Sequence, residues 1–221
     1  MRVKALYDLH VHSLFSDGEL LPSEIARRAE ALGYKAIAIS DHVDPSNMEW
    51  VLTKILKARE QLQDHFNVQI VVAVELTHLP PKLIEKYAKQ AKALGAELVL
   101  VHGETIVEPV AKGTNRAAAS CGYVDILAHP GLIAVEEAEK AVENGVFLEI
   151  SARSGHSLSN GHVVKVAEEA GAKLLLNSDL HSPSDFLTPD HAIKVVLGAG
   201  VPRNRLEEVL LQNPKKLLRE L

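Results

Sequence analysis

Cysteine is nearly absent from this sequence, because Cys121 is the single one among 221 residues. An intramolecular disulfide and a cysteine-based metal cluster are therefore both excluded. No apolar run is long enough to span a bilayer, and Asp8, His10 and His12 interrupt the region where a signal peptide would need an apolar stretch. We expect a cytoplasmic protein that has no membrane partner.

A surplus of positive charge is also absent. Lys and Arg number 24 against 29 Asp and Glu, which gives a formal net charge of -5. Nucleic-acid-binding proteins usually carry a basic surplus, so this balance argues against a broad contact with a phosphate backbone. It does not exclude nucleic acid, because several bound dications would reverse the local sign of the charge. No Gly-rich dinucleotide or P-loop signature follows any apolar run, which excludes the commonest functions of open α/β sheets.

The apolar pattern predicts one α/β domain over residues 1–221. Hydrophobic residues make up 47% of the chain, and short aliphatic runs alternate with amphipathic stretches at a spacing of roughly 20–35 residues, typical of repeated βα units. Strands are predicted at Lys4 to Val11, Ala36 to Ser40, Val68 to Val74, Glu97 to Val101, Val124 to Ala128, Val146 to Ile150 and Lys173 to Asn177. Helices are predicted at Pro22 to Leu32, Glu49 to His65, Pro80 to Leu94, Val135 to Glu143 and His162 to Ala170. One or two short helices should close the chain between Arg203 and Leu221, with a break at Asn213-Pro214.

Metal-binding residue types recur at the carboxyl ends of these strands, where parallel βα proteins place their active sites. They are His10, His12, Asp41, His42, Glu75, His102, His129, Glu149, Asp179 and His181. Residues i and i+2 of a strand point to one face, so His10 with His12 can chelate one ion, and Asp179 with His181 can close the site. Imidazole suits Zn, Fe, Mn or Ni, and a carboxylate such as Glu75 can bridge two ions.

These strand ends resemble a known family. Between Asp8 and His181 the chain contains, in order, DLHVHSLFSDG, SDH, VELTH, VHGE, AHPG and SDLH. The series resembles the motifs of the PHP (polymerase and histidinol phosphatase) family. The resemblance implies a distorted (β/α)7 barrel, in agreement with the strands predicted from the apolar pattern.

The family pattern also implies three divalent ions, which would be Zn, Mn or Fe. The first would be held by His10, His12, Glu75 and Asp179, the second by Glu75, His102 and His129, and the third by Asp17, His42 and His181. A hydroxide that bridges the ions would attack a small phosphate monoester in line, as in histidinol phosphatases. Glu75, His42 and Arg153 are the residues that we expect to act in catalysis.

Arg153 is the candidate phosphate-binding residue. It follows the sixth predicted strand in EISARSG, in a loop that should face the site. Arginine binds phosphate bidentately, whereas lysine offers only a point charge. A plain surface arginine is the alternative.

Four neighbours of the predicted site are less specific. Asp41 is expected to hydrogen-bond a ligand histidine rather than bind an ion, and Glu149 is either such a support or a ligand. His78 belongs either to a substrate loop or to the surface. His156 lies in a Ser/Gly loop beside Arg153.

The resemblance implies a metal-dependent phosphoesterase acting on a small phosphorylated substrate, and two alternatives stay open. PHP domains also hydrolyse phosphodiesters or trim nucleic-acid ends. A ribonuclease P protein subunit resembles this fold without the metal set and acts as an RNA-binding scaffold, and the segments SGHSLSNG and LLLNSDLH are similar to it. The complete ligand set favours an enzyme, because so many buried ionisable groups are costly in a purely structural role. The sequence does not determine the oligomeric state.

Overall fold

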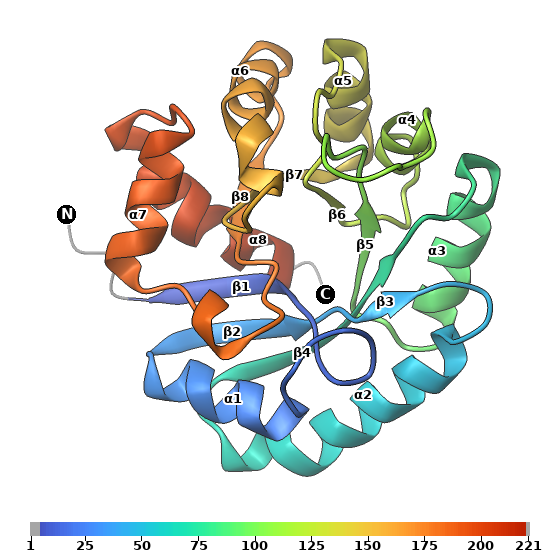
Figure 1. The fold of residues 1–221 in the computed structure, drawn as a ribbon, viewed down its shortest axis with the longest axis vertical. Coiled ribbons are helices and arrows are strands. Elements are labelled where there is room, and N and C mark those ends of the chain that lie inside the picture. Colours follow the sequence, from blue (N-terminus) through green and yellow to red (C-terminus); the bar gives the residue numbers. More distant parts are fainter. Residues whose placement is uncertain (1–4, 220–221) are drawn as a thin grey trace.

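The computed structural model describes residues 5–219 and contains a parallel sheet that curls into a nearly closed barrel (Figure 1). Hydrogen-bonded strands follow the order β1-β2-β4-β5-β6-β7-β8, and a two-residue strand, β3, pairs with β4. The predicted (β/α)7 barrel is confirmed, whereas β3 was not predicted, and Lys4 lies outside the described residues. The strands are β1 (Leu6–Val11), β2 (Tyr34–Ile39), β3 (His42–Val43), β4 (Gln69–Leu76), β5 (Leu98–His102), β6 (Ile126–Ala128), β7 (Phe147–Ser151) and β8 (Leu174–Asn177).

A ring of helices surrounds the strands in Figure 1. Helix α1 illustrates why, since its buried residues Ile25, Ala26 and Ala29 recur at helical spacing and so cover one face of the sheet. No helix within residues 5–219 has both the length and the apolarity needed to cross a membrane. The helices are α1 (Pro22–Ala31), α2 (Met48–Leu62), α3 (Ile84–Ala93), α4 (Thr114–Ala119), α5 (Val135–Asn144), α6 (Asn160–Ala170), α7 (Pro189–Gly198) and α8 (Asn213–Arg219).

Apolar side chains fill the inside of the barrel. The inner cluster consists of Leu9, Ala38, Val71, Ala73, Leu98, Leu100, Ile126, Phe147, Leu175 and Leu217. Along β4, the inward-facing Val71 and Ala73 are followed two residues later by Glu75, and along β5, Leu100 is followed by His102. The alternation that builds the core therefore also directs the polar residues at the strand ends into the mouth of the barrel.

Strand β1 also directs polar side chains into the mouth of the barrel, but it does so through a β-bulge. Its pairing with β2 shifts register between Asp8 and Val11. Leu9 consequently lies in the inner cluster, whereas Val11, two residues later, lies in the larger apolar cluster that also contains helix residues such as Ile25. The bulge turns both His10 and His12 toward the mouth.

The seam between β8 and β1 is closed by few hydrogen bonds. The His12 N–H donates to the Leu180 carbonyl at 2.8 Å, and the Leu180 N–H donates to the His10 carbonyl at 3.3 Å. Nearer the start of β1, a side chain joins the two strands, because the Leu9 N–H donates to Asn177 Oδ1 at 2.9 Å. This seam brings the SDLH segment beside the two histidines of β1.

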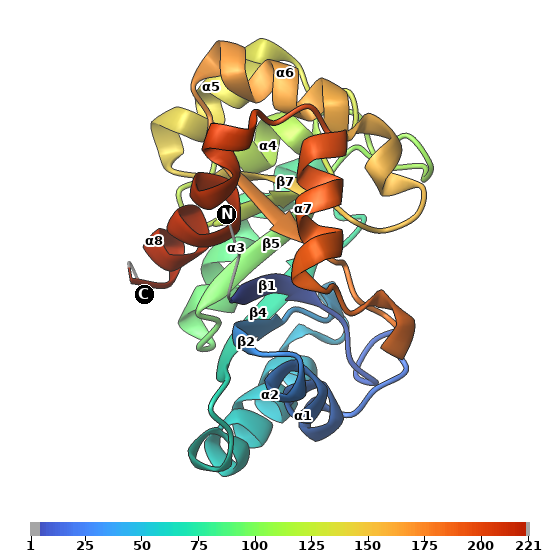
Figure 2. The same cartoon turned by 90° about the vertical axis from the view of Figure 1, so that its left-hand side faces the viewer.

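The C-terminal segment covers the other end of the barrel. A π-helical turn (Glu208–Gln212) runs directly into α8, Asn213 Nδ2 donates to the Leu174 carbonyl at 2.8 Å, and Leu217 joins the inner cluster. Figure 2 shows α8 on the side opposite the loops that follow the strands. The predicted break at Asn213-Pro214 falls where the π-helical turn changes into α8, with no turn or loop between the two helical segments.

Candidate metal centre

All residues predicted as ligands meet at the carboxyl-terminal mouth of the barrel. Most are buried, whereas His42 and His181 are half-buried and the Asp17 side chain is 56% exposed. A cavity of about 270 Å³ opens there. Its wall is formed by Asp17, His42, Thr77, His78, His102, Glu108, His129, Arg153, His156, Asp179 and His181.

The residues predicted for the first ion converge at the bottom of this mouth. Asp179 Oδ1 lies 3.2 Å from His12 Nε2 and 3.6 Å from His10 Nε2. Glu75 Oε1 lies 3.4 Å from His10 Nε2. Two tetrahedral ligands with bonds of about 2.1 Å to one ion are themselves about 3.4 Å apart. The observed separations therefore match those of ligands that share an ion.

Glu75 connects the first group to the second. Its Oε1 is also 3.5 Å from His129 Nε2. Ligand atoms of Glu75, His102 and His129 all lie within 4.8 Å of one another. One carboxylate oxygen thus faces both groups, which is the arrangement of a bridging carboxylate.

Asp17 is the centre of the third group. Its Oδ1 lies 3.3 Å from His181 Nε2 and 3.5 Å from His42 Nε2. The same oxygen is 3.9 Å from His12 Nδ1. His12 therefore faces the first group with one ring nitrogen and the third with the other, a contact that the sequence did not predict.

Several buried atoms of these groups have no hydrogen-bond partner within residues 5–219. An unpaired buried polar atom destabilises a protein by about 1–3 kcal/mol. Divalent ions would pair with those of these atoms that face other ligands, such as His10 Nε2, His12 Nε2 and Glu75 Oε1. Zn, Mn and Fe all accept a mixture of imidazole and carboxylate ligands. The residues thus fit the ions that the family pattern implies. The atoms are His10 Nε2, His12 Nδ1 and Nε2, Glu75 Oε1, His102 Nδ1 and His129 Nδ1.

The electrostatics of the site favour the metal-binding form of Asp179, Glu75 and His12. Burial alone would raise the pKa of Asp179, but His10 and His12 hold it below its usual range. Burial opposes ionisation of Glu75 as well, yet His10 and His42 hold its pKa well below the usual value. Burial, assisted by His42, lowers the pKa of His12 to about 3, so its imidazole is neutral. Ionised carboxylates and neutral imidazoles are the species that bind metals. Against the effect of burial, neighbouring carboxylates raise the pKa of His10, His42 and His102, so an ion bound by these imidazoles would displace a proton.

Glu149 orients His10. Its Oε2 accepts hydrogen bonds from His10 Nδ1 and Asn177 Nδ2, both at 2.8 Å, and its Oε1 accepts one from the His129 N–H at 3.2 Å. A hydrogen bond at Nδ1 leaves His10 Nε2 directed at Asp179. The sequence left open whether Glu149 binds an ion or supports a ligand histidine by a hydrogen bond, and these contacts are those of a supporting residue.

Asp41 supports the loop that carries Asp17. Its Oδ1 accepts from the Ser13 N–H at 2.8 Å and from Ser16 Oγ at 2.6 Å, and its Oδ2 accepts from Ser13 Oγ at 2.7 Å. The expectation that Asp41 hydrogen-bonds a ligand histidine is wrong, because in the described chain these serines occupy both oxygens.

Arg153 reaches the cavity from the β7–α6 loop. Its Nη1 donates to the Asp179 carbonyl at 3.2 Å, and its Nε lies 3.7 Å from Asp179 Oδ2. The side chain is 33% exposed, so part of the guanidinium remains accessible from the cavity. Arg153 thus lies on the side of the cavity expected from its position after β7.

Sequence reasoning missed Glu108, which reaches back into the cavity from the β5–α4 loop. Its Oε2 lies 3.1 Å from His102 Nε2 and 3.4 Å from His78 Nε2, and its Oε1 lies 3.5 Å from His156 Nε2. His156 is fixed in turn by a 2.7 Å hydrogen bond between its Nδ1 and Thr105 Oγ1. No strand-end spacing indicates these residues, because the paths of two loops bring them together.

Residues with an unusual backbone conformation line the same cavity. Outside glycine, the described residues with positive φ are His78 (52°), His129 (27°) and Asp179 (54°). All three line the cavity. Side chains disfavour this region, and residues held there concentrate at functional sites. His78 therefore belongs to the wall of the site rather than to the general surface.

The fold and its mouth define an α/β barrel whose strand ends could hold metal ions. The PHP domain family model matches residues 8–102. An uncharacterized protein of Methanocaldococcus jannaschii is 50% identical over 216 residues, which cover 97% of this chain and 99% of the relative. The chain belongs to the PHP domain family.

More distant relatives carry functional names. A protein of Thermoanaerobacter sp. (strain X514) named "Probable phosphatase" is 25% identical, over 99% of this chain and 96% of its own. Ribonuclease P protein component 3 of Methanosarcina barkeri is 26% identical, over 96% of this chain and 88% of its own. A chain in the cryo-EM structure of archaeal ribonuclease P with mature tRNA has the same fold, with a TM-score of 0.73 and 15% identity over 97% of this chain and 90% of that chain.

Proposed function

We propose that this chain is a metal-dependent phosphoesterase that hydrolyses a small phosphate monoester, in the manner of a histidinol phosphatase. One observation supports this most. Buried carboxylate and imidazole atoms converge at separations such as 3.2 Å (His12–Asp179) and 3.5 Å (Glu75–His129), and several have no hydrogen-bond partner in the described chain. Membership of the PHP domain family and the relative named as a phosphatase agree with the proposal.

Three groups of residues would hold the ions. His10, His12, Glu75 and Asp179 would hold the first, Glu75, His102 and His129 the second, and Asp17, His42 and His181 the third. Bound divalent ions supply charge neutralisation at phosphate oxygens and lower the pKa of water to near neutrality.

The side chains of the chain itself would bind and orient the substrate. Arg153, held against Asp179, would donate hydrogen bonds to the phosphate. Glu75 Oε2 and His42 Nδ1 lie 2.6 Å apart, and this contact would hold the second and third ligand groups at a fixed distance from each other. A cavity of about 270 Å³ has room for a phosphate and a small alcohol.

Phosphate release by purified protein reconstituted with Zn, Mn or Fe tests the proposal. We expect hydrolysis of p-nitrophenyl phosphate, loss of that activity in Glu75→Gln, and wild-type activity in Glu49→Gln, a change at an exposed acid on α2. Metal-loaded protein that releases no phosphate from any monoester would contradict the proposal. A faster rate on bis(p-nitrophenyl) phosphate would favour a phosphodiesterase or exonuclease instead.

A ribonuclease P subunit-like RNA-binding scaffold is the second candidate. The similarity to ribonuclease P protein component 3 favours it. The net charge of -5 and the convergent ligand set weigh against it, since a scaffold needs an RNA-binding surface rather than buried ligands. Tight binding of structured RNA by protein that elemental analysis finds free of metal would reverse the order of the two candidates.

A further inference from the structure

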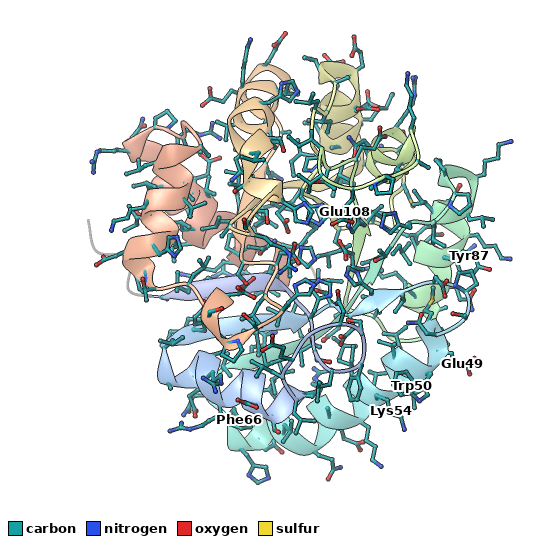
Figure 3. All side chains as sticks on the ribbon, viewed as in Figure 1. Glu49, Trp50, Lys54, Phe66, Tyr87 and Glu108 are labelled. Atoms are coloured by element: carbon teal, nitrogen blue, oxygen red, sulfur yellow. The ribbon has the colours of Figure 1, made fainter. Side chains whose placement is uncertain are left out.

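The loop between β5 and α4 holds Glu108 over the cavity. At its base, Glu104 Oε1 accepts hydrogen bonds from the Gly113 N–H at 2.9 Å and the Asn115 N–H at 3.0 Å. Asn115 Oδ1 accepts one from the Glu104 N–H at 2.9 Å, so both ends of the loop are joined. Figure 3 shows Glu108 toward the centre of the barrel, whereas Glu49 lies at the periphery. The loop therefore presents this carboxylate to the site.

Glu108 meets two histidines at distances typical of shared ligands. Its Oε2 lies 3.1 Å from His102 Nε2 and 3.4 Å from His78 Nε2. Ligands of one ion are separated by about 3.0–3.4 Å when the bonds are about 2.1 Å long. The three ligand atoms lie within 4.8 Å of one another, so His78, His102 and Glu108 form an outer ligand group.

His102 belongs both to this outer group and to the buried group with Glu75 and His129. The outer group is open to solvent, since the side chains of His78 and Glu108 are 43% and 36% exposed. The inner residues are almost fully buried, with Glu75 at 0% and His129 at 2% exposure. One imidazole thus connects an accessible ligand group to an enclosed one.

We propose that His78, Glu108 and His102 form an entry position, at which divalent cations such as Zn²⁺ or Mn²⁺ first bind on their way to the buried centre. A hydrated ion would exchange water for the exposed ligands and for His102, and would then move inward onto Glu75 and His129. The exposed ligands make the entry position weaker than the buried groups. The inference rests on the metal centre of the proposed function and not on its hydrolytic activity.

Zinc uptake by metal-free protein tests the entry position. The full-length chain is dialysed against a chelator, mixed with Zn²⁺ in a stopped-flow instrument, and followed with a fluorescent zinc indicator. We expect Glu108→Gln and His78→Ala to slow uptake about tenfold, since each removes a ligand or charge that draws ions to the cavity, while the zinc content at equilibrium stays that of the wild type. Glu108→Asp, which keeps the charge, should recover part of the rate.

Matched controls and outcomes make the test decisive. Glu49→Gln and His65→Ala alter exposed residues away from the cavity and should take up zinc at the wild-type rate. Wild-type uptake rates in both Glu108→Gln and His78→Ala would overturn the proposal. So would reduced zinc content without a slower rate, because these residues would then be ordinary ligands. Zinc uptake that depends on Glu108, in a protein that hydrolyses no phosphate ester, would leave the entry position standing and refute the phosphoesterase.

Discussion

His10 and Glu149 form a fully buried pair, in which His10 Nδ1 lies 2.8 Å from Glu149 Oε2. Glu149→Gln keeps the size of the side chain but replaces the charged acceptor with an amide. His10 becomes a weaker ligand and its orientation less fixed, so we expect metal affinity to fall about 10–100-fold. Competition with a chromophoric chelator measures the affinity. Glu136→Gln, at an exposed residue of α5, is the matched control, and equal affinity of both variants would refute the supporting role.

Metal removal should lower the thermal stability of the protein. Ions that pair with the unpaired atoms of His10, His12 and Glu75 bind the folded chain only. A ligand present at 100 times its Kd adds about 2.7 kcal/mol to the free energy of unfolding, which corresponds to about 5–10 °C in Tm for a domain of this size. Differential scanning calorimetry with and without chelator measures the shift. In Glu75→Gln the shift should shrink, and an identical Tm with and without chelator in the wild type would contradict a metal centre.

Arg153 gives a prediction about substrate binding. In Arg153→Met the apolar stem remains, but the guanidinium that points into the cavity beside Asp179 is gone. We expect kcat/KM for a phosphate monoester to fall about 100-fold, in line with the loss of a charge-assisted hydrogen bond pair. Arg153→Lys should recover only part of the loss, because lysine cannot bind bidentately. Steady-state kinetics at fixed metal content tests this, and an unchanged kcat/KM would make Arg153 a surface residue.

Gly131 gives a prediction about stability. Its φ is +61°, and a Cβ built there would overlap the carbonyl oxygen of Glu104, in the loop that leads to Glu108. Gly131→Ala must strain this backbone or displace the loop, so we expect a loss of at least about 2 kcal/mol in the free energy of unfolding. Urea denaturation measures it. Gly122→Ala is the control, since a Cβ there meets no atom within 4 Å, and it should change stability by less than about 0.5 kcal/mol.

The pair of Arg205 and Glu208 gives a pH dependence away from the metal centre. Arg205 donates from Nη2 and Nε to the two Glu208 oxygens at 2.7 and 2.9 Å. These hydrogen bonds lower the pKa of Glu208 below its usual value. A carboxyl with a lowered folded-state pKa stabilises the fold above its unfolded pKa of about 4.3 and loses that contribution as the pH falls through the folded value. Glu208→Gln should therefore destabilise the protein by about 0.2–1 kcal/mol at pH 7 and by less at pH 3. Urea titrations at both pH values measure the difference, and a constant difference would contradict the assignment.

The tertiary structure corrected predictions from the sequence where local patterns were ambiguous. Asn213-Pro214 marks a change from a π-helical turn to α8 rather than a loop, because the Asn213 side chain bonds the start of β8 and Leu217 fills the base of the barrel. Helix α7 (Pro189–Gly198) and the short β3 were not predicted. Asp41 was expected to hydrogen-bond a ligand histidine, but the loop of Ser13 folds back, and the Ser13 N–H and hydroxyl donate to the two Asp41 oxygens instead.

The sequence by itself determined that carboxylates and imidazoles gather at one end of a parallel sheet, and the resemblance to the PHP family implied that this sheet is a barrel. Side chains alternate along a strand and parallel strands end on one side, so residues such as Glu75 and His102 had to face a common mouth. The tertiary structure alone decided how they meet. The bulge in β1 aims His10, and the long loop after β5 brings Glu108 to His102. Bulges and loop paths depend on contacts between segments far apart in the chain, and no local spacing encodes such contacts.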